Sequence, residues 1–412
     1  MKSYIKQNGK FRITLNKKQL LFAFVLCVFI FIERNALTKL DALHIKHYLL
    51  MGMLFLYGIP LLKRKNLRAY KEAKYVVIVC IVLYLISIIM QISHLSFKLY
   101  SVGEIYYLII PLLYGVTVFN NINSDDVDTI MYLTLAVCLF SYFFWTMQMD
   151  TFTLSNMIKM FDLRNLFIKS ISPVGESDLA NYFMLLYLYF TYRKKRVATV
   201  LSAVGVFFGY KRFAVLFLII FIIVLRFVPR YKKVNKVFIY TAIAVFLVLP
   251  FVTYFLCSDE FANWFYMKFK VDFNEFTMTR FYLINLLIDS HITNYGLGTT
   301  TAFLNRLTGA AKSAGNLHND IFRIYYETTI VGSLVFTYNY FKMSEKSWFT
   351  FMTMLYIFAE LFGAHFIGPG TTSFWMVAYL LIFTISIDVD KHKEQLKLQK
   401  AELINETKEQ GS

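Results

Sequence analysis

Long runs of apolar residues, separated by short polar segments, recur from one end of the chain to the other. An α-helix needs roughly 20 mainly apolar residues to cross the hydrocarbon core of a membrane, and many of these runs approach that length. The pattern predicts about twelve membrane helices and therefore an all-α, polytopic integral membrane protein. The predicted helices are Leu20 to Ile32, His47 to Leu62, Tyr75 to Ile92, Ile105 to Phe119, Ile130 to Met147, Leu179 to Tyr192, Val197 to Phe208, Phe213 to Phe227, Val237 to Leu256, Ile321 to Phe341, Phe349 to Phe366 and Thr372 to Ile387.

The composition agrees with this pattern. Of the 412 residues, 58% are apolar and only 17% are charged, and the mean hydropathy is +0.52. This is more apolar surface than the core of a soluble protein can bury, so a soluble globular protein is excluded. We expect one transmembrane domain over residues 1–387, with a long extracytoplasmic loop at 257–317, and a charged, helix-forming cytoplasmic tail over residues 388–412.

The distribution of Lys and Arg predicts the topology. Most of the 43 basic residues lie at the N-terminus, in the tail and in four alternate inter-helix segments, which are therefore expected to face the cytoplasm. Both termini are then cytoplasmic, and Cys257 to Leu317 lies outside. One segment on the inward side, Asn120 to Asp128, is acidic, but acidic residues carry little topological weight. The formal charge of +17 comes largely from these basic segments, which determine the topology beside anionic lipid. It therefore does not indicate nucleic-acid binding.

Gly209-Tyr210-Lys211-Arg212 interrupts an apolar stretch from Val197 to Phe227. A tight hairpin at this point keeps the basic segments on either side in the cytoplasm, and each arm is shorter than the membrane is thick. The tip is therefore expected to be recessed, with Arg212 at a polar cavity near the outer surface. The alternative is that Lys211 and Arg212 only extend to the membrane interface.

Ionisable residues also fall inside predicted membrane helices. Arg323 and Glu327 are four residues apart, which predicts a helical ion pair with a structural role. Glu360 and His365 are five apart and are expected on different sides of their helix. Because intramembrane charges often line an interior path, Glu360 is kept as a candidate substrate-binding residue, with structural pairing as the alternative.

The predicted outward loop contains several distinct segments. Phe261 to Phe273 is rich in aromatic residues, which favours the lipid headgroup layer over the alternative of sugar stacking. Arg280 interrupts an apolar helical pattern, and Asn294 to Gly298 has the composition of a turn. The loop ends in Asn316-Leu317-His318-Asn319-Asp320 at the start of a membrane helix. A histidine and an amide at the membrane surface indicate chemistry on a lipid-linked substrate.

The order of these motifs resembles the O-antigen polymerase and O-antigen ligase family. The resemblance covers roughly residues 172 to 341 and rests most specifically on the His-Asn pair before a helix with a later glycine. The motifs are Asp178-Leu179-Ala180-Asn181, with Glu176-Ser177 in place of the family's Pro-Asn pair, Gly209-Tyr210-Lys211-Arg212-Phe213-Ala214, Arg280, Tyr295-Gly296-Leu297-Gly298, Leu317-His318-Asn319-Asp320 and Thr329-Ile330-Val331-Gly332.

The resemblance implies a metal-independent glycosyltransferase, without a cofactor, that acts on undecaprenyl-diphosphate-linked glycans at the outer face of the bacterial cytoplasmic membrane. Arginine suits the charge that develops on the departing diphosphate, so Arg212 and Arg280 are the candidate clamps. Histidine titrates near the working pH, so His318 is the candidate base for the acceptor hydroxyl. The candidate substrate-binding residues are Asn319, Arg323, Lys211 and Glu360.

We expect a polysaccharide polymerase that moves a growing chain onto the next lipid-linked repeat unit, in a pathway with a flippase and a chain-length regulator. The first alternative is a ligase of the same family, which transfers finished glycan to another acceptor. Both activities need a diphosphate clamp and a base. A lipid-linked sugar transporter is a third possibility, although the sequence lacks clear internal repeats and its polar candidates gather at the predicted outer face.

Overall fold

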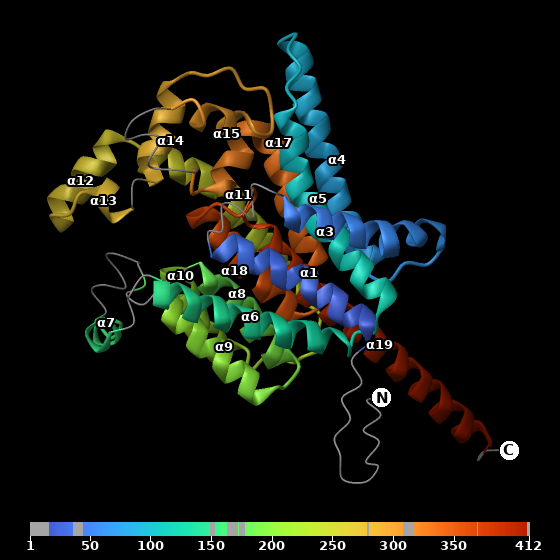
Figure 1. Ribbon diagram of the computed structural model, residues 1–412. Helices are drawn as coiled ribbons and strands as arrows, with labels where there is room; N and C mark the ends of the chain where they lie inside the picture. The colour runs from blue at the N-terminus through green and yellow to red at the C-terminus, as the bar shows by residue number, and fades with distance from the viewer. Residues whose placement is uncertain are drawn as a thin grey trace.

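The computed structural model describes residues 16–35, 44–148, 153–162, 172, 178–277, 280–307, 317–368 and 370–409. Across these residues the regular secondary structure is helical (Figure 1). The helices are α1 (Lys17–Arg34), α3 (Ile45–Met53), α4 (Tyr70–Ser93), α5 (Tyr100–Asn121), α6 (Val127–Gln148), α7 (Leu154–Lys159), α8 (Leu179–Tyr192), α9 (Arg196–Gly209), α10 (Arg212–Val224), α11 (Lys236–Leu256), α12 (Asp259–Phe269), α13 (Phe273–Phe276), α14 (Arg280–Asp289), α15 (Thr299–Leu304), α17 (Asp320–Met343), α18 (Trp348–Gly363) and α19 (Thr372–Glu409). A π-helix, η1 (Leu54–Gly58), and a 3-10 helix, η2 (Ile59–Lys63), extend α3.

All twelve predicted membrane segments overlap helices, which confirms the all-α class for the described part of the chain. Among the described residues, six helices are long and apolar enough to cross a membrane by length and composition. They are Ile45–Lys63, Tyr70–Ser93, Tyr100–Asn121, Val127–Gln148, Lys236–Leu256 and Thr372–Ile404. The predicted count of about twelve spans is therefore not confirmed, because α9, α10 and α18 are shorter and α17 carries ionisable residues.

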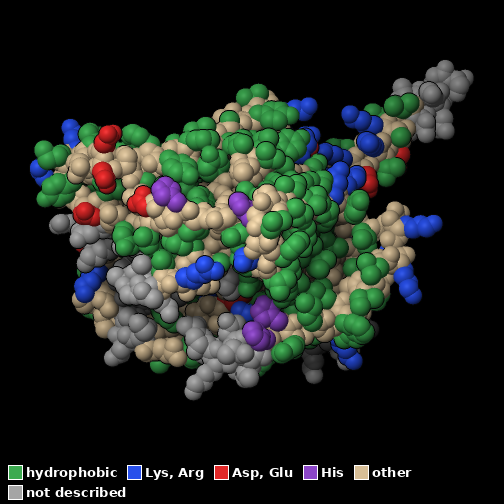
Figure 2. All heavy atoms as spheres, turned by 90° about the horizontal axis from the view of Figure 1, so that it is seen from above, with side chains coloured by type: hydrophobic (Ala, Val, Ile, Leu, Met, Phe, Trp, Pro, Cys, Tyr) green, Lys and Arg blue, Asp and Glu red, His purple; other side chains and the backbone are tan. Residues whose placement is uncertain are grey.

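Large apolar side chains are exposed over much of the surface, and Figure 2 shows them covering wide areas of one face. On α10, Leu216, Ile219 and Ile223 are each half exposed or more. In water such a surface would favour aggregation, whereas in a bilayer it faces lipid. The distribution is consistent with a membrane-embedded protein.

The most deeply buried helix is α8, in which every residue except Thr191 is buried. A helix that is apolar around its whole circumference belongs in a core. Its main neighbour is α9, and α6, α10, α18 and α19 also pack against it. The close approach depends on small residues: a β-carbon on Gly209 would lie 2.5 Å from that of Ala180. This contact holds the end of α9 against the start of α8.

The predicted hairpin is present between α9 and α10. Tyr210 ends α9 in the left-handed conformation, with φ of 56°, and its hydroxyl donates a hydrogen bond of 2.6 Å to the Asp162 carbonyl. The turn places Lys211 beside the N-terminus of α8, and Arg212 begins α10. This four-residue interruption of the apolar stretch thus positions two of the candidate site residues, Lys211 and Arg212.

Basic segments that were predicted to share the cytoplasmic side meet on one face of the protein. Arg193 forms ion pairs with Asp125 at 2.7 Å, with Asp128 at 2.8 Å and with Asp388 at 3.0 Å. Lys346 is paired with Glu72 and Asp390, and Lys233 with Glu345. We call this surface the tail face. The acidic Asn120 to Asp128 segment therefore lies beside cations that neutralise it.

The predicted long loop at 257–317 is not an extended loop. Its described residues form four short helices, α12 to α15, which gather at one end of the molecule while α19 projects from the opposite end (Figure 1). Ser258 caps α12 by accepting a hydrogen bond from the Phe261 amide at 3.2 Å. The aromatic side chains of α12 are largely exposed, with Trp264 at 54% and Tyr266 at 53%.

The tail predicted from residue 388 is not separated from the membrane domain by a break. The last helix, α19, begins at Thr372 and continues to Glu409. Its first half is buried in the bundle, and its side chains become exposed from about Lys391 onward. The tail is therefore helical, as its composition predicts.

Candidate functional site

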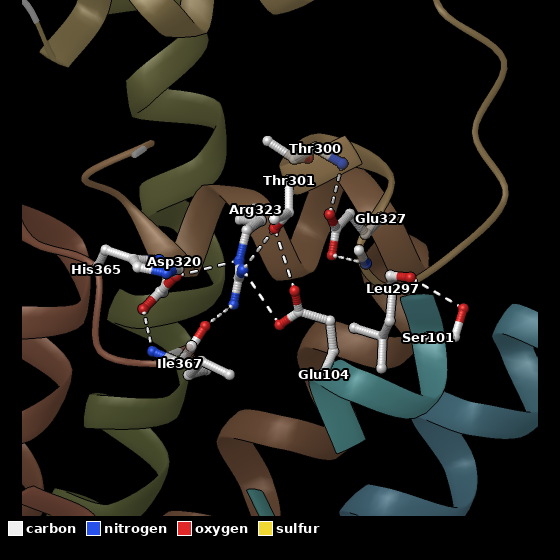
Figure 3. Close-up of polar contacts among 12 residues, drawn as sticks. Ser101, Glu104, Leu297, Thr300, Thr301, Asp320, Arg323, Glu327, His365 and Ile367 are labelled. Carbon is white, nitrogen blue, oxygen red and sulfur yellow. Dashed lines mark hydrogen bonds and ion pairs between the residues drawn. The ribbon is translucent and has the colours of Figure 1, made fainter. Parts of the chain in front are cut away.

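Arg323, in the first turns of α17, is the centre of a buried polar network (Figure 3). It forms ion pairs with Glu104 of α5 at 3.3 Å and with Asp320 at 3.1 Å. Its Nη2 donates a hydrogen bond of 2.7 Å to the Ile367 carbonyl. These contacts join α5, α17 and the segment that follows α18. A guanidinium that is engaged on all sides holds the fold together and has little capacity left for a substrate.

Glu327 does not form the predicted ion pair with Arg323. Its carboxylate instead accepts hydrogen bonds from the Gly298 amide at 3.0 Å and the Thr300 amide at 2.8 Å. These amides open α15, so Glu327 caps that helix and fixes the preceding turn. The prediction was wrong because nearer partners from distant parts of the chain, Glu104 and the turn amides, satisfy the two charges.

Asn319 caps α17. Its side-chain oxygen accepts a hydrogen bond of 2.9 Å from the Phe322 amide, and its amide nitrogen donates to the Thr253 hydroxyl of α11 at 3.3 Å. Both ends of the side chain are therefore committed to structure. The asparagine fixes the backbone on which His318, its neighbour, is carried.

His365 lies beyond the end of α18, which stops at Gly363, and not within a membrane helix as predicted. Its Nδ1 is 3.0 Å from Oδ1 of Asp320. The other oxygen of Asp320 accepts hydrogen bonds from the amides of Phe366 and Ile367. The Asp320 carboxylate therefore fixes the orientation of the imidazole ring through Nδ1. No local sequence pattern predicts this pair, because its members are 45 positions apart.

Lys211 lies between two carboxylates. Its ammonium is 2.9 Å from Asp178, at the start of α8, and 3.3 Å from Glu360 of α18. Asp178 also forms an ion pair with Arg34 of α1 at 3.1 Å. The charges of Lys211 and Arg34 hold the pKa of Asp178 well below its usual range. Glu360, which is fully buried, therefore has a structural counter-ion, and the hairpin is tied to both α8 and α18.

Arg280 opens α14, is partly buried and differs from the cations described above. Within the described part of the chain it forms no ion pair and no hydrogen bond. One guanidinium nitrogen would lie 3.6 Å from a β-carbon on Gly363, which locates it at the end of α18. Burial, followed by the positive charge of Arg212, lowers the pKa of Arg280. The two arginines are therefore neighbours of like charge, and Arg212 also lies over the Phe276 ring.

His318 lies in the short segment before α17 and is partly buried. Among the described residues its ring nitrogens have no hydrogen-bond partner. Burial, followed by the positive charge of Arg280, lowers the pKa of His318 to about 4. The imidazole is therefore neutral near pH 7 and can accept a proton.

The sequence-predicted residues thus separate into two groups. Lys211, Glu360, Arg212, Arg280 and His318 belong to one electrostatically connected region. Asn319 and Arg323 lie beside it but are engaged in structural contacts. In the described residues, no group of three or more His, Cys, Asp or Glu side chains has the arrangement of a metal site.

Comparisons with protein families, with curated proteins and with solved structures find no match for this chain. The resemblance to the O-antigen polymerase and ligase family therefore rests on its motifs.

Proposed function

We propose that the protein is a membrane glycosyltransferase that polymerises undecaprenyl-diphosphate-linked repeat units into a surface polysaccharide. The observation that carries this proposal is a cation without an ion-pair partner close to an imidazole that can accept a proton. Arg280 is a partly buried cation that forms no ion pair among the described residues, and it is near enough to Arg212 and His318 for their charges to influence one another.

The charge balance supports an anionic substrate. Burying a cation without a partner is costly, so native proteins normally pair it. The two carboxylates of this region, Asp178 and Glu360, are already engaged by Lys211. The charge of Arg280 therefore has no ion-pair partner among the described residues. A diphosphate suits this arginine because arginine donates two parallel hydrogen bonds to phosphate oxygens.

The proposed reaction uses this excess charge at the leaving group. The acceptor hydroxyl oxygen attacks the anomeric carbon of the donor sugar, and the bond from that carbon to the lipid diphosphate oxygen breaks. The electron pair of the broken bond stays on the diphosphate, where Arg280 and Arg212 stabilise it. The hydroxyl proton passes to His318, which is unprotonated when the reaction begins.

The surrounding network has the supporting role that such chemistry requires. Asn319 caps the helix that follows His318, and Arg323 and Asp320 anchor the start of α17. Lys211 connects the hairpin that carries Arg212 to α8 and α18. Rigid positioning of this kind keeps catalytic groups at their working distance.

Incubation of the purified protein with a defined lipid-linked repeat unit tests the proposal. A ladder of products is the expected result. A single transfer to a different acceptor would identify a ligase, which needs the same clamp and base. Movement of the substrate across vesicle membranes without any new glycosidic bond would identify a transporter and overturn the proposal.

Replacing His318 by Ala is expected to reduce transfer by about 100-fold or more, because the variant lacks the proposed general base. The matched control is His291→Ala, which alters an exposed histidine of the same segment. Wild-type elongation by His318→Ala would contradict the proposed base. Both variants should be checked for unchanged insertion and thermal stability.

A further inference from the structure

A polar pocket of about 370 Å³ lies on the tail face, away from the candidate functional site. It is formed by the start of α1, the segment between η2 and α4, and the end of α5. Its volume is within the range of roughly 300–1,000 Å³ that is usual for small-molecule sites. The lining residues are Asn16, Arg64, Asn66, Arg68, Asn120, Asn121, Ile122, Asn123 and Asp126.

The pocket is separated from the candidate site by the length of α1. Asn16, at one end of that helix, lines the pocket, whereas Arg34, at the other end, binds Asp178. An α-helix rises 1.5 Å per residue, so its 18 residues span about 27 Å. A ligand in the pocket cannot contact the groups that the proposed reaction uses.

Reciprocal hydrogen bonds hold the walls of the pocket in place. The Arg68 amide donates to the side-chain oxygen of Asn120 at 2.9 Å, and the side-chain amide of Asn120 donates to the Arg68 carbonyl at 3.2 Å. Arg64 donates to the Asn120 carbonyl at 2.7 Å. Asn120 is buried, so the connection between the η2–α4 segment and α5 is fixed before any ligand arrives.

The charges of the pocket favour an anion. Within the described residues, neither Arg64 nor Arg68 forms an ion pair; their partners are carbonyl and amide oxygens, which leave the charge unneutralised. The one carboxylate of the lining, Asp126, accepts a hydrogen bond from the Asn123 amide. Two guanidinium groups beside several asparagine amides are donors that suit phosphate oxygens.

Exposed apolar residues directly precede the pocket arginines along the chain. Leu62, two residues before Arg64, is 85% exposed, and Leu56 and Ile59 of η1 and η2 are 64% and 51% exposed. A phosphate group bound between the arginines would therefore have its ester substituents next to an apolar helix surface. Basic pockets at the ends of membrane helices bind lipid headgroups in this way.

We propose that this pocket binds the phosphate group of an anionic phospholipid, with the acyl chains along η1 and η2. An anionic phospholipid and a soluble phosphate compound both carry a phosphate ester. They differ because only the phospholipid also uses the apolar surface for binding. The inference does not depend on the proposed glycosyltransferase activity.

Native mass spectrometry of the detergent-purified full chain, supplied with phosphatidylglycerol or phosphatidylcholine, tests the proposal. We expect the wild-type protein to retain phosphatidylglycerol. The double variant Arg64→Gln, Arg68→Gln is expected to retain at least about tenfold less, because it loses charge-assisted hydrogen bonds to the phosphate. Lys65→Gln is the matched control, because it removes a charge from the same segment but does not line the pocket. Equal retention by wild type and double variant would overturn the inference.

A second arm separates the two sources and guards against misfolding. Glycerol phosphate that binds as well as the lipid and competes with it would assign the pocket to a soluble phosphate compound and overturn the lipid proposal. Asn123→Asp keeps the size of the side chain and places a carboxylate 3.4 Å from the Arg68 guanidinium. It is expected to weaken phosphatidylglycerol retention while leaving thermal stability unchanged.

Discussion

At the scale of single residues, the function of each cation depends on whether a carboxylate lies next to it. The sequence predicted Arg280 as a diphosphate clamp and Lys211 and Arg323 as substrate-binding residues. The structure gives Lys211 and Arg323 anionic partners and gives Arg280 none in the described chain. The excess charge identifies Arg280 as the residue whose replacement should affect substrate binding most directly.

Replacing Arg280 by Lys is therefore expected to lower the transfer rate by about tenfold or more. Lysine keeps the charge but loses the planar pair of donors, and a charge-assisted hydrogen bond contributes about 1.5–3 kcal/mol. The measurement is the initial rate with a defined lipid-linked repeat unit. Arg306→Lys, at an exposed position of the same segment, is the control. Full activity of Arg280→Lys would show that a point charge is sufficient.

The protonation state of His318 predicts the acidic limb of the pH profile. Burial and Arg280 lower its pKa to about 4, below the ordinary 6.5, so the base form persists down to that pH. Transfer should stay level from about pH 8 to pH 5 and fall only as the ring becomes protonated near pH 4. A rate profile whose acidic limb has its midpoint at 6 to 7 would contradict this assignment.

At the scale of secondary-structure elements, the α9–α10 hairpin positions the site by its close contact with α8. Gly209 lies where a β-carbon would be only 2.5 Å from that of Ala180. The contact keeps Lys211 within 2.9 Å of Asp178 and Arg212 beside Arg280. A small residue at the start of the hairpin thereby controls the geometry of the cationic groups.

Gly209→Ala is expected to destabilise the protein by about 1–3 kcal/mol and to reduce transfer, because α9 must move away from α8. Thermal unfolding in detergent and the initial transfer rate are the measurements. Gly103→Ala is the control, since a β-carbon at that position in α5 meets no atom within 4 Å. Equal stability and activity of the two variants would argue against the close packing.

At the scale of the whole molecule, the ion pairs between inter-helix segments lie at one end and the candidate functional site lies at another. Basic and acidic segments between helices meet on the tail face, and the candidate functional site forms around Asp178, Arg280 and His318 at the other end of α1. The positive-inside distribution predicts that the tail face is cytoplasmic. The site would then be on the outer side.

Labelling with a membrane-impermeant thiol reagent tests this arrangement. Lys65→Cys and Lys397→Cys are expected to react from the same side of sealed cells or vesicles, and Lys268→Cys from the opposite side. The background is low because Cys80, Cys138 and Cys257 are buried and Cys27 is partly buried. Reaction of all three variants from one side would show that the predicted topology is wrong.

The sequence by itself determined the features that depend on local order along the chain. The apolar runs specify helices, the Gly209 to Arg212 interruption specifies a hairpin, and Asn294 to Gly298 specifies a turn, because each depends on neighbouring residues. The positions of Arg212, Arg280 and His318 beside predicted membrane helices, together with the motif resemblance, likewise made them candidate site residues.

Only the tertiary structure decided which polar groups are partners. Glu327 caps α15 instead of binding Arg323, and His365 binds Asp320 across 45 positions. Electrostatic pairing depends on distance in space, and a charge binds the nearest counter-charge whatever its place in the chain. For this reason the sequence could predict which cations belong to the site. Only the tertiary structure shows that Arg280 has no ion-pair partner among the described residues.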